Sequence, residues 1–145
     1  MAIFKTRDEL ITCLGILYDQ AKRDPRIAPK IKDSGLVIQF RYDEPEAVAT
    51  IIASRPPTQE GAYFDVVWDD DPGVKPDIEM SMKADVAHQF WHGKVNLMAA
   101  LTRRQIIAKG PIPKILKLLP AVTPMYDMYP RVLRELGRED LIIQK

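Results

Sequence analysis

The chain has 145 residues, which is enough for one domain with a hydrophobic core and too short for two domains of ordinary size. Hydrophobic residues make up 46% and charged residues 28%, a balance that excludes a chain disordered throughout. No apolar run reaches the roughly 20 residues of a membrane span, and no signal peptide is recognisable. Cys13 is the only cysteine, so an internal disulfide is excluded. We therefore expect a single cytoplasmic domain over residues 1–145.

Charge is distributed unevenly along the chain. The net charge of +1 is too small to indicate a nucleic-acid partner. Residues 42–85 carry 11 acidic and 3 basic side chains, whereas residues 101–145 carry 9 basic and 4 acidic ones. Two interpretations remain open: an acidic and a basic solvated face, or a basic C-terminal third that meets an anionic membrane surface or a phosphate-bearing ligand.

The N-terminal part begins with a helical pattern. Leu10, Leu14 and Leu17 recur at helical spacing, which predicts a helix over residues 6–23. Thr6 and Glu9 form a capping-box sequence at its start. Cys13 falls among the leucines, so we expect a buried thiol rather than a nucleophile. We expect residues 24–35 to form an irregular, proline-containing connection.

Alternating or β-branched segments then predict strands over residues 36–42, 47–53, 62–68 and 77–83. The first of them places Ile38, Phe40 and Tyr42 on one face. Strands joined by such short connections must be antiparallel, because a parallel return needs a crossover of roughly a dozen or more residues.

The C-terminal part is predicted to be mainly helical. A helix should run from Asp85 to Gly93, followed by a short helix over 97–101 with Asn96 as its N-cap. Residues 104–109 predict a fifth strand that ends at Gly110. Proline-interrupted apolar segments follow over 112–119 and 125–136, and Thr123-Pro124 reads as the N-cap and first residue of the last helix. This order predicts an α+β fold with helices covering one face of a sheet.

The sequence contains no recognisable catalytic motif. His88 and His92 are the only histidines, and Asp85 shares their helix face, so three candidate metal ligands align. Gln89 stands where a zinc protease would have its general-base glutamate, however, and Gln cannot accept a proton. We predict no catalytic residue, no metal site and no cofactor; a metal-dependent enzyme that uses both histidines is retained as an alternative.

Flexible and bulky apolar side chains are concentrated in the C-terminal half. Five of the six methionines are Met80, Met82, Met98, Met125 and Met128. Methionine adapts to irregular shapes, so the pattern fits either an ordinary core or a cavity that accepts varied apolar ligands.

Three segments resemble the sterol carrier protein 2 (SCP-2) superfamily. The first is PDIEMSMKAD over residues 76–85, and the second is FWHGKVNLMAAL over 90–101, which is similar to the family's G-K-x-(N/D)-x-x-x-A-(L/I) stretch. The third is QIIAKG over 105–110, similar to the family's last strand and closing glycine. Arg103 stands where many members have glycine. The order of the elements agrees over most of the chain.

This resemblance implies a five-stranded, mainly antiparallel sheet covered by helices, with an apolar tunnel between them. It also implies binding of a sterol, fatty acid, fatty acyl-CoA or other lipid. From the prolines that interrupt residues 112–119 and 125–136, we expect these segments to form a movable cover over the tunnel. We predict that the following residues contact the lipid: Met80, Met82, Phe90, Trp91, Leu97, Met98, Leu101, Ile112, Ile115, Leu116, Leu119, Met125 and Met128.

Two non-catalytic functions follow from the resemblance. The first is a lipid carrier that transfers or presents its ligand and touches anionic membranes transiently. The second is an accessory subunit that presents a hydrophobic intermediate to a partner enzyme.

Overall fold

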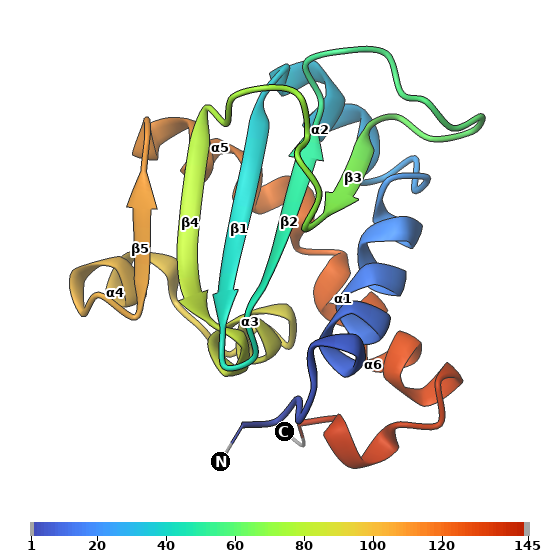
Figure 1. The fold of residues 1–145 in the computed structure, drawn as a ribbon, viewed down its shortest axis with the longest axis vertical. Helices are drawn as coiled ribbons and strands as arrows, with labels where there is room; N and C mark the ends of the chain where they lie inside the picture. Colours follow the sequence, from blue (N-terminus) through green and yellow to red (C-terminus); the bar gives the residue numbers. More distant parts are fainter. Residues whose placement is uncertain (1, 144–145) are drawn as a thin grey trace.

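The computed structural model describes residues 2–143 and contains one five-stranded sheet with strand order β3-β2-β1-β4-β5 (Figure 1). The strands are β1 (Val37–Asp43), β2 (Ala47–Ile52), β3 (Asp65–Trp68), β4 (Ile78–Lys83) and β5 (Ile106–Lys109). Every neighbouring pair is antiparallel except β1 and β4, which run parallel at the centre of the sheet. The predicted α+β fold with a mainly antiparallel sheet is confirmed.

The successive strands β1, β2 and β3 are antiparallel as expected, and the parallel pair is formed by β1 and β4, which are not successive in the chain. β4 does not pair with β3, its neighbour in sequence; it crosses β2 and β3 and lies against β1, with Phe40 opposite Met80. The β2–β3 hairpin and residues 69–77 together supply the long crossover that a parallel pair requires. Sequence spacing between successive strands carries no information about a strand that skips its neighbours.

The helices are α1 (Arg7–Ala21), α2 (Ala28–Ser34), α3 (Ala84–Trp91), α4 (Leu97–Thr102), α5 (Ile112–Val122) and α6 (Met125–Glu135), followed by the 3-10 turn η1 (Glu139–Leu141). Two predicted caps are confirmed. The Thr6 hydroxyl accepts a hydrogen bond from the Glu9 N–H at 3.1 Å, and the Asn96 side chain accepts one from the Ala99 N–H at 2.9 Å. These bonds satisfy backbone donors that lack helical partners.

Two helix predictions are wrong. Residues 28–34 form α2 rather than an irregular connection, because Pro29 lies in its first turn, where a missing N–H costs nothing, and Gly35 ends it with φ +64°. Thr123 is not the N-cap of α6. Its hydroxyl donates to the Pro120 carbonyl at 3.0 Å, at the end of α5, and α6 starts at Met125 without a side-chain cap.

The core lies between the inner face of the sheet and the helices. Ile38 and Tyr42 of β1 are buried on that face together with Met80 and Met82 of β4. Cys13 is 1% exposed within α1, as predicted. α1 and α6 pack side by side, and the first and last described residues, 2 and 143, lie near each other at one end of the sheet (Figure 1). This arrangement leaves α5 as the helix that crosses behind the central strands.

Gly110 provides a test of how tightly β5 closes against β4. Its φ is +121°, and a Cβ at this position would lie 2.5 Å from the Asp77 carbonyl oxygen. We expect Gly110→Ala to lower the free energy of unfolding by about 2–4 kcal/mol, because backbone strain and overpacking add. Gly73→Ala is the matched control, since Gly73 has φ +73° with open space around it, and about 1 kcal/mol is expected there. Equal decreases in the free energy of unfolding of the two variants, measured by urea denaturation, would contradict the close approach of Gly110 to the Asp77 carbonyl.

Candidate functional site

An apolar cavity of about 100 Å³ lies between the inner face of the sheet and residues of all six helices, α1 to α6. Every residue that lines it is apolar or aromatic, and its wall presents no polar atom. Eight predicted lipid contacts line this cavity: Met80, Met82, Phe90, Trp91, Leu97, Ile115, Leu119 and Met125. That they contact a ligand stays a prediction.

The other five predicted residues lie outside the cavity wall. Met98 is 53% exposed on α4, because it points away from the face that carries Leu97. Leu101, Ile112 and Leu116 are half-buried against the core. Met128 is buried within α6 but does not line the cavity. The apolar spacing of these residues predicts that they share helix faces, but it does not show which element each face packs against.

Sequence reasoning missed the N-terminal half of the cavity wall. This half comprises Tyr18 and Ala21 of α1, Ile31 of α2, Ile38, Phe40 and Tyr42 of β1, Ile51 of β2, and Phe64. Ala87, Ile106, Leu118 and Val122 complete the wall. The alternation along β1 had already placed three of these side chains on one face. What it lacked was the parallel partner β4, which brings them opposite the predicted methionines.

One cluster of polar groups is embedded in the cavity wall: Tyr18, Tyr42 and Trp91, from α1, β1 and α3. The Trp91 indole N–H donates to the Tyr18 hydroxyl at 3.1 Å, and the Tyr18 and Tyr42 hydroxyls are hydrogen-bonded to each other. Burial raises the pKa of Tyr18 to about 12 and holds that of Tyr42 well above its usual value of 10. Both groups are therefore neutral hydroxyls at physiological pH.

Helix α5 is the least buried part of the cavity wall. Only Ile115 and Ala121 of α5 are buried, whereas Leu118, Leu119 and Val122 are half-buried although they line the cavity. Apolar burial is the main force that holds such a helix in place, so α5 is held more weakly than β1 and β4 opposite it, whose cavity-facing side chains are mostly buried.

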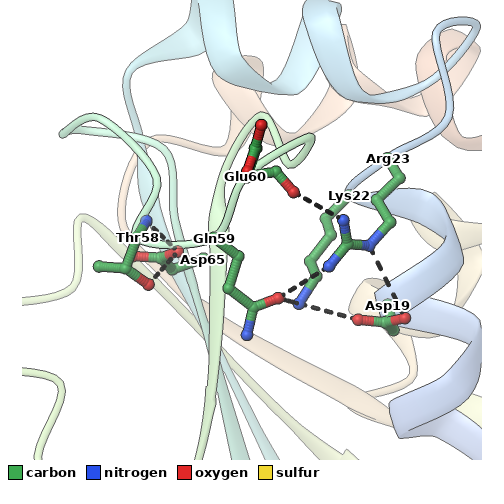
Figure 2. Close-up of polar contacts among 7 residues, drawn as sticks. All are labelled: Asp19, Lys22, Arg23, Thr58, Gln59, Glu60 and Asp65. Atoms are coloured by element: carbon green, nitrogen blue, oxygen red, sulfur yellow. Dashed lines mark hydrogen bonds and ion pairs between the residues drawn. The ribbon is translucent and has the colours of Figure 1, made fainter.

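A polar network between the end of α1 and the β2–β3 loop stabilises the part of the cavity wall that these two segments form (Figure 2). The Lys22 ammonium lies 2.8 Å from the Gln59 side-chain oxygen and 2.9 Å from Asp19. The Arg23 guanidinium donates to the same Gln59 oxygen at 2.9 Å and to the Glu60 carbonyl at 3.0 Å. Lys22 is 6% exposed, so its charge is compensated within the protein. The network fixes the loop that delivers Phe64 to the cavity.

The two histidines are committed to structural hydrogen bonds. His88 is 1% exposed; its Nδ1 bonds to the Tyr129 hydroxyl and its Nε2 to the Leu141 carbonyl, both at 2.8 Å. The Nδ1 of His92 bonds to the His88 carbonyl at 2.8 Å, and its Nε2 accepts from the Ile143 N–H at 3.2 Å. No ring nitrogen of either histidine is left free to ligate a metal.

The third aligned residue is also engaged, because an Asp85 carboxylate oxygen accepts the Ile3 N–H at 2.8 Å. Residues 2–143 contain no group of three His, Cys, Asp or Glu side chains placed to hold a metal ion. This geometry therefore does not favour the alternative of a metal-dependent enzyme that uses both histidines.

Comparison with known proteins gives the fold its name. The chain matches no protein-family sequence model, and no curated protein matches its sequence. Among solved structures it is similar to sterol carrier protein 2 from Yarrowia lipolytica in its apo form, at 18% identity and TM-score 0.54, over 91% of this chain and 95% of that one. The chain has the sterol carrier protein 2 fold.

Two further structures agree with this SCP-2 fold. The sterol carrier protein domain 2 of Helicoverpa armigera matches at 16% identity and TM-score 0.52, over 98% of this chain and 93% of that one. UbiJ-SCP2, described as a ubiquinone synthesis protein, matches at 12% identity and TM-score 0.53, over 86% of this chain and 99% of that one. These identities establish the architecture alone. Among the helices of residues 2–143, none is long and apolar enough to cross a bilayer.

The buried His88 makes stability depend on pH. Burial, and secondarily the neighbouring His92, lowers the pKa of His88 from 6.5 to about 4. The unfolded chain therefore binds more protons than the folded chain between these values, so the free energy of unfolding should fall as pH decreases from 6.5 to 4. The loss attributable to His88 is at most about 3 kcal/mol. In urea denaturation across this range, the free energy of unfolding of His88→Gln should depend less steeply on pH than that of the parent protein. An unchanged pH dependence would contradict the lowered pKa of His88.

Proposed function

We propose that the chain binds a lipid non-catalytically, with the lipid's apolar part held between the sheet and α5. The observation that carries this proposal is the cavity, whose wall is apolar and built from every layer of the fold. Ordinary cores are packed without voids of this size, so an apolar space at the centre of the molecule requires an explanation. The SCP-2 fold supports the proposal, since two of the similar structures are described as sterol carrier proteins.

The cavity has to enlarge before a lipid can enter. About 100 Å³ is less than the roughly 300–1,000 Å³ of a typical ligand pocket. Helix α5 is the element whose outward movement costs the least apolar burial, because most of its cavity-facing side chains are half-buried already. Each CH₂ group of the ligand that replaces this contact contributes roughly 0.8 kcal/mol, so an acyl chain readily offsets the burial that α5 loses.

Filling the cavity should block binding without destabilising the protein. We expect Leu119→Trp to weaken binding of a fluorescent fatty acid by at least tenfold, because the larger side chain occupies the ligand's space while its burial replaces an empty volume. Displacement titrations and melting temperatures measured on the same protein separate these effects.

Leu116→Trp is the matched control, since Leu116 lies on α5 but does not line the cavity. Binding by this variant should remain within about threefold of the parent. The parent protein must bind the fluorescent fatty acid at low-micromolar concentration for the proposal to stand. If the core were close-packed instead, Leu119→Trp would lower the free energy of unfolding by about 1–3 kcal/mol, and the parent protein would not bind the fluorescent fatty acid.

We also propose that the edge of the molecule formed by α4, β5 and the start of α5 contacts anionic membranes. Residues 86–126 contain no Asp or Glu. Within residues 2–143, no ion pair involves the cations of this segment, which are Lys94, Arg103, Arg104, Lys109, Lys114 and Lys117. Met98 and Ile107, two of the exposed large hydrophobic residues, lie in the same segment. Docking here places α5 beside the bilayer that supplies the ligand (Figure 1).

This surface predicts a charge-dependent interaction with vesicles. The variant Lys114→Glu/Lys117→Glu should bind phosphatidylglycerol vesicles at least tenfold more weakly than the parent, and the parent's binding should weaken as salt rises. Lys5→Glu/Lys30→Glu is the control, since it changes the net charge equally at exposed positions outside the segment. Equal loss in both double variants, or equal parent binding to phosphatidylcholine vesicles, would remove the membrane-facing role.

An accessory role beside an enzyme is the second candidate. It is favoured by the similarity to a structure described as a ubiquinone synthesis protein. In that role the lipid would stay in the cavity while a partner enzyme acts on its exposed end. Tagged protein purified from its host should then retain one stoichiometric enzyme that Leu119→Trp also retains, whereas a free carrier should purify alone.

A further inference from the structure

The side chains of the cavity wall turn their polar atoms away from the cavity. Among residues 2–143, only Tyr18, Tyr42 and Trp91 bring a side-chain nitrogen or oxygen to this wall. The Trp91 indole N–H donates to the Tyr18 hydroxyl at 3.1 Å, and the Tyr18 and Tyr42 hydroxyls bond to each other. Because these atoms meet one another, the three side chains present only ring carbon to the cavity.

The backbone of the wall is closed to the cavity as well. Strand β1 lies between β2 and β4, and β4 lies between β1 and β5, so the hydrogen-bonding groups of both central strands face other strands. The remaining polar candidates are the methionine thioethers, which are only weak acceptors. A polar atom of a ligand inside the cavity therefore finds no strong donor or acceptor in the part of the chain that the structure describes.

This wall determines which end of a lipid enters. No Asp, Glu, Lys, Arg or His of the described chain lines the cavity. A carboxylate or phosphate inside it would be a buried charge without a partner, which is very costly, so the charged end stays outside. A hydroxyl at the other end would lose its hydrogen bonds to water without replacement. It cannot keep a water beside it, because a buried water needs two to four polar partners.

We propose that the cavity selects lipids whose buried end is unoxidised hydrocarbon, and excludes lipids that carry a hydroxyl or carboxyl group at that end. This inference rests on the proposed function, since it concerns which lipid the cavity holds. The selected class has a single polar end, as an unmodified fatty acid has. Chains oxidised at both ends, such as ω-hydroxy acids and dicarboxylic acids, are excluded.

Two isomeric probes test this selection. In ω-hydroxyhexadecanoic acid the hydroxyl is at the chain end, whereas in α-hydroxyhexadecanoic acid it is beside the carboxyl group. We expect the ω isomer to displace a fluorescent fatty acid from the parent protein at least tenfold more weakly than the α isomer, a difference of about 1.4 kcal/mol. Equal displacement by the two isomers would overturn the inference.

A matched pair of variants tests whether the apolar wall causes the selection. Leu119 and Leu116 are both half-buried on α5, but only Leu119 lines the cavity. In Leu119→Gln the new amide supplies a donor and an acceptor, so the difference between the isomers should shrink to about threefold or less. Leu116→Gln should keep the full difference. A full difference in Leu119→Gln, or an equal reduction in both variants, would overturn the proposal. If Leu119→Gln does not fold, the parent protein and the two isomers still decide.

Failure of the proposed function gives a different result. In that case neither isomer, nor hexadecanoic acid itself, displaces a fluorescent fatty acid from the parent protein. Displacement by hexadecanoic acid and equally by both isomers would leave lipid binding standing and remove only the selection against an oxidised chain end.

Discussion

The parallel pairing of β1 with β4 is the constraint on which the cavity depends. It sets Phe40 opposite Met80 and Tyr42 opposite Met82, so one face of the central strands combines residues from two distant parts of the sequence. Shifting this register by one residue would turn the whole set to the outer face. The helices then have only one apolar surface to cover, and the remaining space between α5 and that surface is the cavity.

Much of this fold was accessible from the sequence, because local signals agreed with each other. Thr6 and Asn96 marked helix starts, and strict alternation identified β1 and β4. The SCP-2 resemblance placed these elements in one sheet, and the structure comparison bears this out. Local signals could not supply the strand order, because no sequence pattern near β4 indicates that it pairs with β1 rather than with β3.

The candidate site was predicted only in its C-terminal half for the same reason. Met80 and Leu119 were found from composition and resemblance, whereas Phe64 and Ile31 reach the cavity only through tertiary contacts. Met98 was predicted with Leu97 but lies outside the cavity wall, because a single step along a helix turns a side chain by about 100°. A polar cluster inside an apolar wall is likewise invisible until α1, β1 and α3 are brought together.

The prolines around α5 bear on the outward movement of this helix that the proposed function requires. Pro111 and Pro113 stand at its start, Pro120 lies within it, and Pro124 follows it. Each proline restricts the backbone of the detached segment as well as that of the docked one. A segment restricted in this way gains little conformational entropy on release, so the closed form is favoured without tighter packing. In the proposed lipid carrier, α5 could then be packed loosely enough for ligand exchange while its docked position stays favoured.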